Sequence, residues 1–289
     1  MKNILEKYNY AFDSEYIGKF LSNIEHNMEH WSITNIYMEC LSFLDLTSTH
    51  STDTCEKMLE LAQKLEHYTI KYPDYPLPAT LSVYPIFVNA IKKGMEKAPV
   101  KVAATVGGFP SSQTFSEIKY MECKMALEEG ADELEVVFPL SPFFSGNVKE
   151  VVCEISEIKK IAGDKVLKVI LETEALALPD NIASAAFLAM EAGADFIRTN
   201  TGKMKSAVTP MTAAIICQTI HAFYKKTGKK VGFKVDGGVV TAKDAACYYA
   251  IVETLLDKSW LVPDLFRLGS FQMANNLLSE LEQKRVLFF

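Results

Sequence analysis

Several short apolar segments of this chain carry polar or charged side chains at even spacings. In an extended strand, successive side chains alternate between faces, so residues at even spacing share one face. Apart from Thr199, the residues between them are apolar and would pack on neighbouring helices. The sets are Asp45 and Thr47; Glu133 and Glu135; Lys168 and Glu172; Arg198 and Asn200; Lys234 and Asp236. We therefore expect these charges to point toward the inside of the fold.

Cations and carboxylates on one face allow two interpretations. Buried charges are costly unless paired, so Lys168, Arg198 and Lys234 can form a structural ion-pair network with the carboxylates. The same residue types can also perform chemistry, with a lysine as nucleophile and a carboxylate that moves protons. Because the charges gather at the ends of five predicted strands, the pattern favours a site, ancestral or working.

Glycine-bearing loops follow the last three predicted strands. Such loops present backbone N–H groups to a phosphate in many barrels, although glycines also serve tight turns alone. Three neighbouring loops favour phosphate binding over simple turns. The candidate binding residues are Gly202, Lys203, Gly237, Gly238, Gly269 and Ser270.

The elements that must hold these residues alternate between short apolar strands and longer amphipathic helices. This alternation predicts an α/β fold, a single (β/α)8 TIM barrel domain over residues 1–289. An open doubly wound sheet is the alternative, and the lack of GxGxxG after the first strand disfavours it. An extra N-terminal helix over 13–30 is expected to close the bottom of the barrel. The predicted strands are 40–47, 79–84, 100–106, 133–138, 167–173, 194–200, 231–236 and 265–269.

The composition, 49% hydrophobic and 23% charged, is normal for a soluble globular protein. A net charge of −6 gives no electrostatic basis for binding nucleic acid or an acidic membrane surface. No segment has the apolar length of a membrane span or the apolar core of a signal peptide. The six scattered cysteines are expected to be reduced thiols. These features predict a cytoplasmic protein.

Motifs in a fixed order over nearly the whole chain resemble those of deoxyribose-phosphate aldolases. They are LDLTSTHSTDT (44–54), VYP (83–85), VAATVGGFPSS (102–112), GADELEVVFP (130–139), LKVILETEAL (167–176), GADFIRTNTGK (193–203), VGFKVDGG (231–238) and FRLGS (266–270). The resemblance implies a barrel that needs no metal or cofactor. It also implies cleavage of 2-deoxyribose-5-phosphate to acetaldehyde and glyceraldehyde-3-phosphate through a Schiff base on a strand-six lysine.

The resemblance assigns roles to individual residues. Lys234 matches the strand-seven lysine that activates the nucleophile. Polar positions of the family site are matched by Asp45, Thr47 and Lys168, and its phosphate loops by Gly202, Lys203, Gly237 and Gly238.

The sequence departs from the family pattern at positions to which the resemblance assigns catalysis or phosphate binding. Arg198 occupies the nucleophile position, and Glu135 replaces the proton-relay aspartate. Asp236 stands where the family has a small neutral residue, so it would repel a phosphate dianion by about 1–4 kcal/mol. Phe271 and Gln272 occupy the region of paired phosphate-binding serines, and no tyrosine follows Tyr249.

Three hypotheses follow for the function. Arginine stays protonated and offers no free amine to form an imine. The first hypothesis is therefore an aldolase that has lost most or all of its activity and has a binding, regulatory or scaffolding role. The second is an active class I aldolase in which Lys234 is a relocated nucleophile, kept uncharged by Arg198, with Glu135 as acid and base. The third, an anion receptor built from Arg198 and Lys203, binds a sugar acid or phosphate without catalysis.

The expected partners are a small sugar phosphate or another anion, and a protein that the sequence does not identify. Neither nucleic acid nor a membrane is expected. The resemblance implies a monomer or a homodimer.

Overall fold

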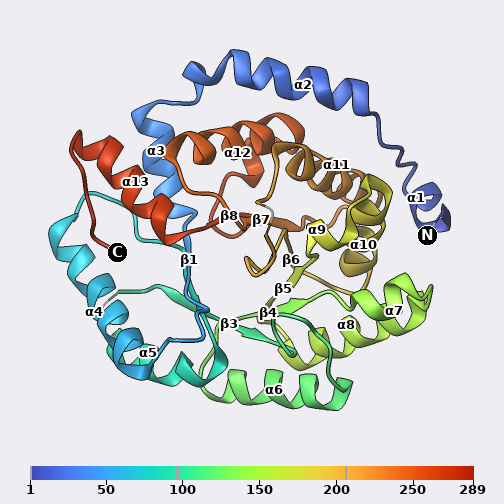
Figure 1. Cartoon of the computed structure of the whole chain (residues 1–289), viewed down its shortest axis with the longest axis horizontal. Coiled ribbons are helices and arrows are strands. Elements are labelled where there is room, and N and C mark those ends of the chain that lie inside the picture. Colours follow the sequence, from blue (N-terminus) through green and yellow to red (C-terminus); the bar gives the residue numbers. More distant parts are fainter. Residues whose placement is uncertain (1, 96–97, 206) are drawn as a thin grey trace.

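Eight parallel strands form one sheet in the order in which they occur along the chain in this computed structural model, which describes residues 2–95, 98–205 and 207–289. A parallel bridge between Leu44 and Leu268 joins the first strand to the last and closes the barrel (Figure 1). The strands are β1 (Asp45–Thr47), β2 (Thr80–Val83), β3 (Lys101–Val106), β4 (Glu133–Val137), β5 (Val166–Ile170), β6 (Phe196–Arg198), β7 (Gly232–Asp236) and β8 (Phe266–Gly269). The predicted (β/α)8 barrel is therefore confirmed.

Helices connect consecutive strands and surround the barrel (Figure 1). They are α1 (Lys2–Lys7), α2 (Ser14–His26), η1 (Met28–His30), α3 (Thr34–Ser42), α4 (Cys55–Lys71), η2 (Pro85–Phe87), α5 (Val88–Gly94), α6 (Ser116–Glu128), α7 (Leu140–Phe144), α8 (Val148–Ala162), α9 (Thr173–Leu176), α10 (Pro179–Glu191), α11 (Pro210–Thr227), α12 (Ala242–Leu255), η3 (Lys258–Trp260) and α13 (Phe271–Glu282). No helix in the described ranges has the length and apolar character needed to cross a membrane.

Capping side chains fix the helices that follow the candidate site strands. The Thr209 hydroxyl accepts from the Thr212 N–H at the start of α11, where Pro210 occupies the first turn. Thr241 and Asp244 form a reciprocal capping box at the start of α12. These caps anchor the loops after β6 and β7, which carry the candidate phosphate-binding glycines.

The predicted start of the first strand at residue 40 is wrong. Residues 40–42 belong to α3, and β1 begins only at Asp45. The buried residues Ile36 and Cys40 lie four residues apart, so they share one face of a helix, and the buried Leu41 extends this face on one side. This face packs on α12 and α13. Apolar content alone does not distinguish such a segment from a buried strand.

The extra N-terminal helix exists as α2, followed by η1, but its predicted place at the bottom of the barrel is wrong. Its buried residues Ile17 and Ile24 lie two turns apart and face α11 and α12. Figure 1 shows α2 outside these two helices, as a second layer on the barrel wall. The amphipathic pattern predicted the helix, and it could not tell which apolar surface the helix would cover.

The end of the chain docks on the barrel. The rings of Phe288 and Phe289 contact Tyr68 of α4. Asn275 of α13 accepts from both backbone N–H groups and donates to the Phe289 carbonyl at 2.9 Å. These contacts place residues 288–289 between α4 and α13, while Leu287 is exposed.

Candidate active site

The inside of the barrel holds a balanced set of buried charges, as the even spacings predicted. Four cations and four carboxylates point inward, and none is more than 6% exposed. The cations are Lys168, Arg198, Lys234 and Arg267, and the carboxylates are Asp45, Glu133, Glu135 and Asp236. Such a set is stable only where each charge has partners.

Glu135, on β4, is at the centre of this network. Its Oε1 accepts from Lys168 Nζ at 2.7 Å and from Lys234 Nζ at 2.9 Å. The hydroxyl oxygen of Ser82 lies 3.1 Å from Oε1. The other oxygen, Oε2, accepts from Arg198 Nη1. Both carboxylate oxygens are thus engaged by side chains of the chain itself.

Asp45, on β1, joins the two lysines from the other side. Its Oδ2 pairs with Lys168 Nζ and with Lys234 Nζ, the latter at 2.9 Å. The Ser82 hydroxyl donates to Oδ1 at 2.8 Å. Lys234 also lies 3.4 Å from the Thr47 hydroxyl oxygen. Lys168 Nζ also lies 2.8 Å from Glu133 Oε2, and Lys234 Nζ lies 3.6 Å from Asp236 Oδ2. Each lysine nitrogen is therefore shared among three carboxylates.

Arg198, at the end of β6, is fully buried and lies between two carboxylates. Besides Glu135, its Nη2 lies 2.9 Å from Asp236 Oδ2, without the alignment of a hydrogen bond. Its Nε donates to the Asn200 carbonyl at 3.0 Å. A Cβ on Gly269 would lie 2.2 Å from Asp236 Oδ2, so a glycine there makes room for the carboxylate. Arg198 and Asp236, two of the residues that the resemblance marks as departures from the family pattern, are thus ion-pair partners.

Arg267, on β8, is a network member that the sequence analysis missed. It pairs with Glu133 Oε1 at 3.1 Å. It lies in register with Lys234 and two residues before Gly269, so the even-spacing rule applied to β8 would have found it. Glu133 is the first residue of β4, so this part of the network lies toward the amino ends of the strands, away from the face where barrel enzymes bind substrates.

The pKa shifts in the network follow from its pairing. Burial alone raises the pKa of Asp45 and Glu135, but Lys168 and Lys234 outweigh it and hold both well below their usual range. Burial lowers and the surrounding carboxylates raise the pKa of Lys168 and Arg198, and the net shift is upward. Asp236 differs, because burial dominates and raises its pKa despite Arg198. Apart from Asp236, these groups are held in their charged forms.

The predicted phosphate-binding residues lie at the carboxyl ends of β6, β7 and β8. Gly202, Gly237 and Gly238 have positive φ angles of 75°, 97° and 81°, which side-chain-bearing residues rarely adopt. Lys203 Nζ donates to the Thr49 carbonyl in the loop after β1. The Ser270 hydroxyl caps α13 by accepting from the Met273 N–H at 3.1 Å. The glycine loops are present, while Lys203 and Ser270 already have partners within the chain.

Glu172, in the loop after β5, is a strained and incompletely paired carboxyl at the same end of the barrel. Its φ is 55°, a left-handed value that is uncommon outside glycine. Its Oε2 accepts from the Thr201 N–H and hydroxyl, whereas its buried Oε1 has no hydrogen-bond partner within the described residues. Burial raises the pKa of this group.

We expect Glu172→Gln to raise the midpoint of urea unfolding near pH 7. A raised pKa favours the neutral carboxyl in the folded state, so its contribution to stability is present below the usual 4.5 and is lost as the pH rises through the folded value. Glutamine stays neutral and still offers an acceptor to Thr201. The gain should be smaller near pH 4, and an equal gain at both pH values would contradict this explanation.

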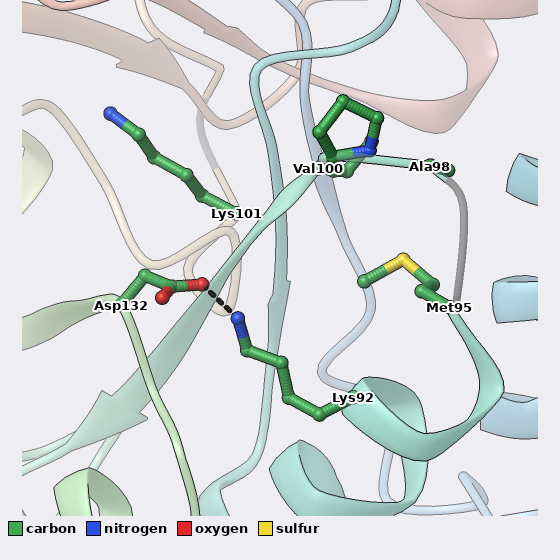
Figure 2. A pocket seen from close by; sticks show the side chains of 7 residues that line it. Lys92, Met95, Ala98, Val100, Lys101 and Asp132 are labelled. Atoms are coloured by element: carbon green, nitrogen blue, oxygen red, sulfur yellow. Dashed lines mark hydrogen bonds and ion pairs between the residues drawn. The ribbon is translucent and has the colours of Figure 1, made fainter.

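A separate surface pocket of about 370 Å³ lies at the amino ends of β3 and β4 (Figure 2). Lys92 and Asp132 on its wall form an ion pair. Lys101 pairs with Asp264 at 2.9 Å. The pocket lies at the opposite end of the strands from the glycine loops, and its charged groups are paired, so it contributes nothing to the candidate site.

A closed parallel barrel with charged side chains inside it and glycine loops at the carboxyl ends of its last strands belongs to the class of (β/α)8 barrels, which build their sites at this end of the strands. The chain belongs to the DeoC/LacD aldolase family, whose model matches residues 41–248. The deoxyribose-phosphate aldolases of Mus musculus and Homo sapiens are each 34% identical to it, over 86% of this chain and 80% of theirs. A Toxoplasma gondii ME49 crystal structure, provisionally described as a deoxyribose-phosphate aldolase, is 26% identical with a TM-score of 0.76, covering 88% of this chain and 98% of that one.

Proposed function

We propose that this chain is a catalytically silent member of the deoxyribose-phosphate aldolase family, a pseudoenzyme with a binding, regulatory or scaffolding role. The observation that carries the proposal is Arg198. It occupies the strand-six position that the resemblance assigns to the Schiff-base lysine, it is fully buried, and it is paired with Glu135 and Asp236.

The chemistry of the guanidinium supports this proposal. An imine requires a neutral amine, and arginine keeps its proton and delocalised charge at every physiological pH. The carboxylates around Arg198 raise its pKa further, against the opposing effect of burial. The adjacent Glu135 is held as a carboxylate with both oxygens engaged, so it has no proton to give to a substrate.

The second hypothesis, that Lys234 is a relocated nucleophile, receives less support from the geometry. Its Nζ lies 2.9 Å from both Asp45 Oδ2 and Glu135 Oε1, and these contacts use the ammonium form. The side chain is also fully buried. Attack on a carbonyl would require the ion pairs of Lys234 to break and its buried amine to become accessible to the substrate.

The third hypothesis, an anion receptor of Arg198 and Lys203, requires these two cations to be free for a ligand. Arg198 is buried between carboxylates, and the Lys203 amine is bound to the Thr49 carbonyl. An incoming anion would compete with Asp236, which already lies beside Arg198. Of the three hypotheses, a family member without aldolase activity is therefore the one that the geometry supports best.

A coupled turnover assay tests the proposal. The purified chain is incubated with 2-deoxyribose-5-phosphate, and released glyceraldehyde-3-phosphate is measured through an NADH-linked enzyme. The human relative serves as the positive control. We expect no rate above that of a heat-denatured sample. A rate that scales with protein concentration and disappears in Lys234→Met would overturn the proposal in favour of the relocated nucleophile.

A further inference from the structure

A pocket of about 380 Å³ lies on the outer side of the barrel wall, where α2 and the segment before it meet α11 and α12. Figure 1 shows α2 outside these two helices, so the pocket is separate from the inside of the barrel. None of its lining residues belongs to the ion-pair network or to the glycine loops. Its volume falls in the range of small-molecule sites.

The segment between α1 and α2 forms one wall of this pocket, and local contacts fix its shape. Asn9 adopts a left-handed φ of 49°, which asparagine tolerates better than most residues. The Tyr10 ring meets Phe187 of α10 edge-on, with the ring centroids 5.8 Å apart. Asp13 caps α2 by accepting from the Tyr16 N–H at 2.9 Å. Asn9, Tyr10 and Tyr16 are therefore held in place along the pocket.

The helices α11 and α12 form the opposite wall. Gln218 and His221 lie three residues apart on α11 and share one face, and Thr254 lines the pocket from α12. His221 Nδ1 is buried without a hydrogen-bond partner within the described residues. The Tyr10 hydroxyl is also buried without one, and the Thr219 hydroxyl beside it donates instead to a backbone carbonyl of α11. Buried polar atoms without partners are rare in proteins, so these two atoms indicate a place where a ligand completes the hydrogen bonds.

The pocket lining is uncharged. It contains no aspartate, glutamate, lysine or arginine. Burial and the nearby Lys225 lower the pKa of His221, against the opposing effect of Asp257, so the imidazole is neutral near pH 7. Burial raises the pKa of Tyr10 to about 12, so its hydroxyl keeps its proton. An anion would lose its hydration here without gaining a cation as partner, which favours an uncharged ligand.

The side chains of the lining fit a flat ligand with donors and acceptors around its edge. The amides of Asn9 and Gln218 each offer a donor and an acceptor, as side-chain amides do when they pair with the edge of a purine. The rings of Tyr10, Tyr16 and His221 supply aromatic surface, on which planar bases stack.

We propose that this pocket binds an uncharged, planar nitrogen heterocycle, such as a purine base or its nucleoside. Gln218 pairs with the edge of the ring, and Tyr16, which is 53% exposed, stacks on its face at the rim. The site is independent of whether the barrel has any aldolase activity.

Isothermal titration with adenosine tests the site. We expect one molecule bound per chain, with a dissociation constant below about 1 mM. Gln218→Ala and Tyr16→Ala should each weaken binding by about tenfold, because one removes an edge pair and the other a stacking contact. Gln63→Ala is the matched control, since Gln63 is exposed on α4, and should leave binding unchanged. A wild type that does not bind adenosine, or a Gln218→Ala variant that binds it equally well, overturns the proposal.

Two further probes test the chemistry of recognition. AMP adds a phosphate to adenosine, and we expect it to bind no more tightly, because the lining holds no cation. Ribose lacks the ring and should give no saturable heat at the same concentration. AMP that binds about tenfold more tightly than adenosine, and is weakened by Gln218→Ala, would show that the pocket recognises phosphate. Ribose that binds as tightly as adenosine would show that the ring is not recognised, and either result overturns the proposal.

Discussion

Replacing Glu135 by glutamine should lower the free energy of unfolding by about 3–5 kcal/mol, the cost of leaving buried charges without their partner. Glutamine keeps the size of the side chain and removes the one negative charge shared by Lys168, Lys234 and Arg198. The three cations then face only Asp45, Glu133 and Asp236. Urea unfolding followed by circular dichroism measures the loss.

Glu128→Gln is the control for this substitution, because Glu128 is exposed on α6 and should change stability by less than about 0.5 kcal/mol. A Glu135→Gln protein as stable as this control would show that the network does not hold the barrel together.

The Glu135 carboxylate also makes the free energy of unfolding depend on pH. The pKa of Glu135 lies below its usual 4.5, so its stabilisation is complete above that value and is lost as the pH falls below it. Asp45 acts in the same direction, since its pKa is also held low. The wild type should therefore lose stability steeply between about pH 5 and pH 2, and Glu135→Gln should lose less over this range.

Removal of the Arg198 guanidinium should have the second large effect. Arg198→Met leaves one oxygen of Glu135 without its cation and leaves Asp236 with Lys234 alone, at 3.6 Å, and we expect a loss of about 3–5 kcal/mol. Adding Asp236→Ala removes one of the stranded carboxylates. The double variant Arg198→Met/Asp236→Ala should recover about 1–3 kcal/mol relative to the sum of the single effects.

A double-mutant cycle measures this coupling. Arg198→Met combined with the distant Glu128→Gln is the control, and its two effects should simply add. If the effects of Arg198→Met and Asp236→Ala on the free energy of unfolding are also additive, the two residues are independent. The proposed pairing of Arg198 with Asp236 would then not contribute to stability.

The sequence predicted the strand order and the inward charges because both depend on local spacing. The contact between Asp236 and Arg198 shows that spacing within one strand does not predict which charges pair between strands. From the sequence, Asp236 was expected to repel a phosphate, whereas in the barrel it pairs with a guanidinium of the adjacent strand. Which charges meet depends on the register between strands, and one chain does not reveal that register.

The errors have similar physical causes. Residues 40–42 and α2 are apolar or amphipathic segments whose partner surfaces are helices, and hydrophobic periodicity does not name the partner. Arg267 was missed because the even spacing was sought only between polar side chains, and Gly269, the residue two positions further along β8, has no side chain. Ser270 is a different case: its hydroxyl caps α13, and its expected role in phosphate binding stays a prediction.

The paired interior agrees with the proposed loss of activity, because the ion pairs stabilise the fold whether or not the barrel catalyses a reaction. In an aldolase, a lysine nucleophile must stay neutral and reachable, which limits how many carboxylates can surround it. Here Lys168, Lys234 and Arg198 each contact at least two carboxylates. This pairing stabilises the charged forms that a Schiff-base mechanism must avoid.

Borohydride trapping tests the central claim most directly. The protein is incubated with acetaldehyde, reduced, digested and mapped by mass spectrometry, with Lys234→Met as the control and the human relative as the positive control. If the chain has no aldolase activity, we expect no reduced adduct on the peptide that contains Lys234, while the human protein is labelled. A stoichiometric adduct on Lys234, absent from Lys234→Met, would contradict the account and make this chain an aldolase with a relocated nucleophile.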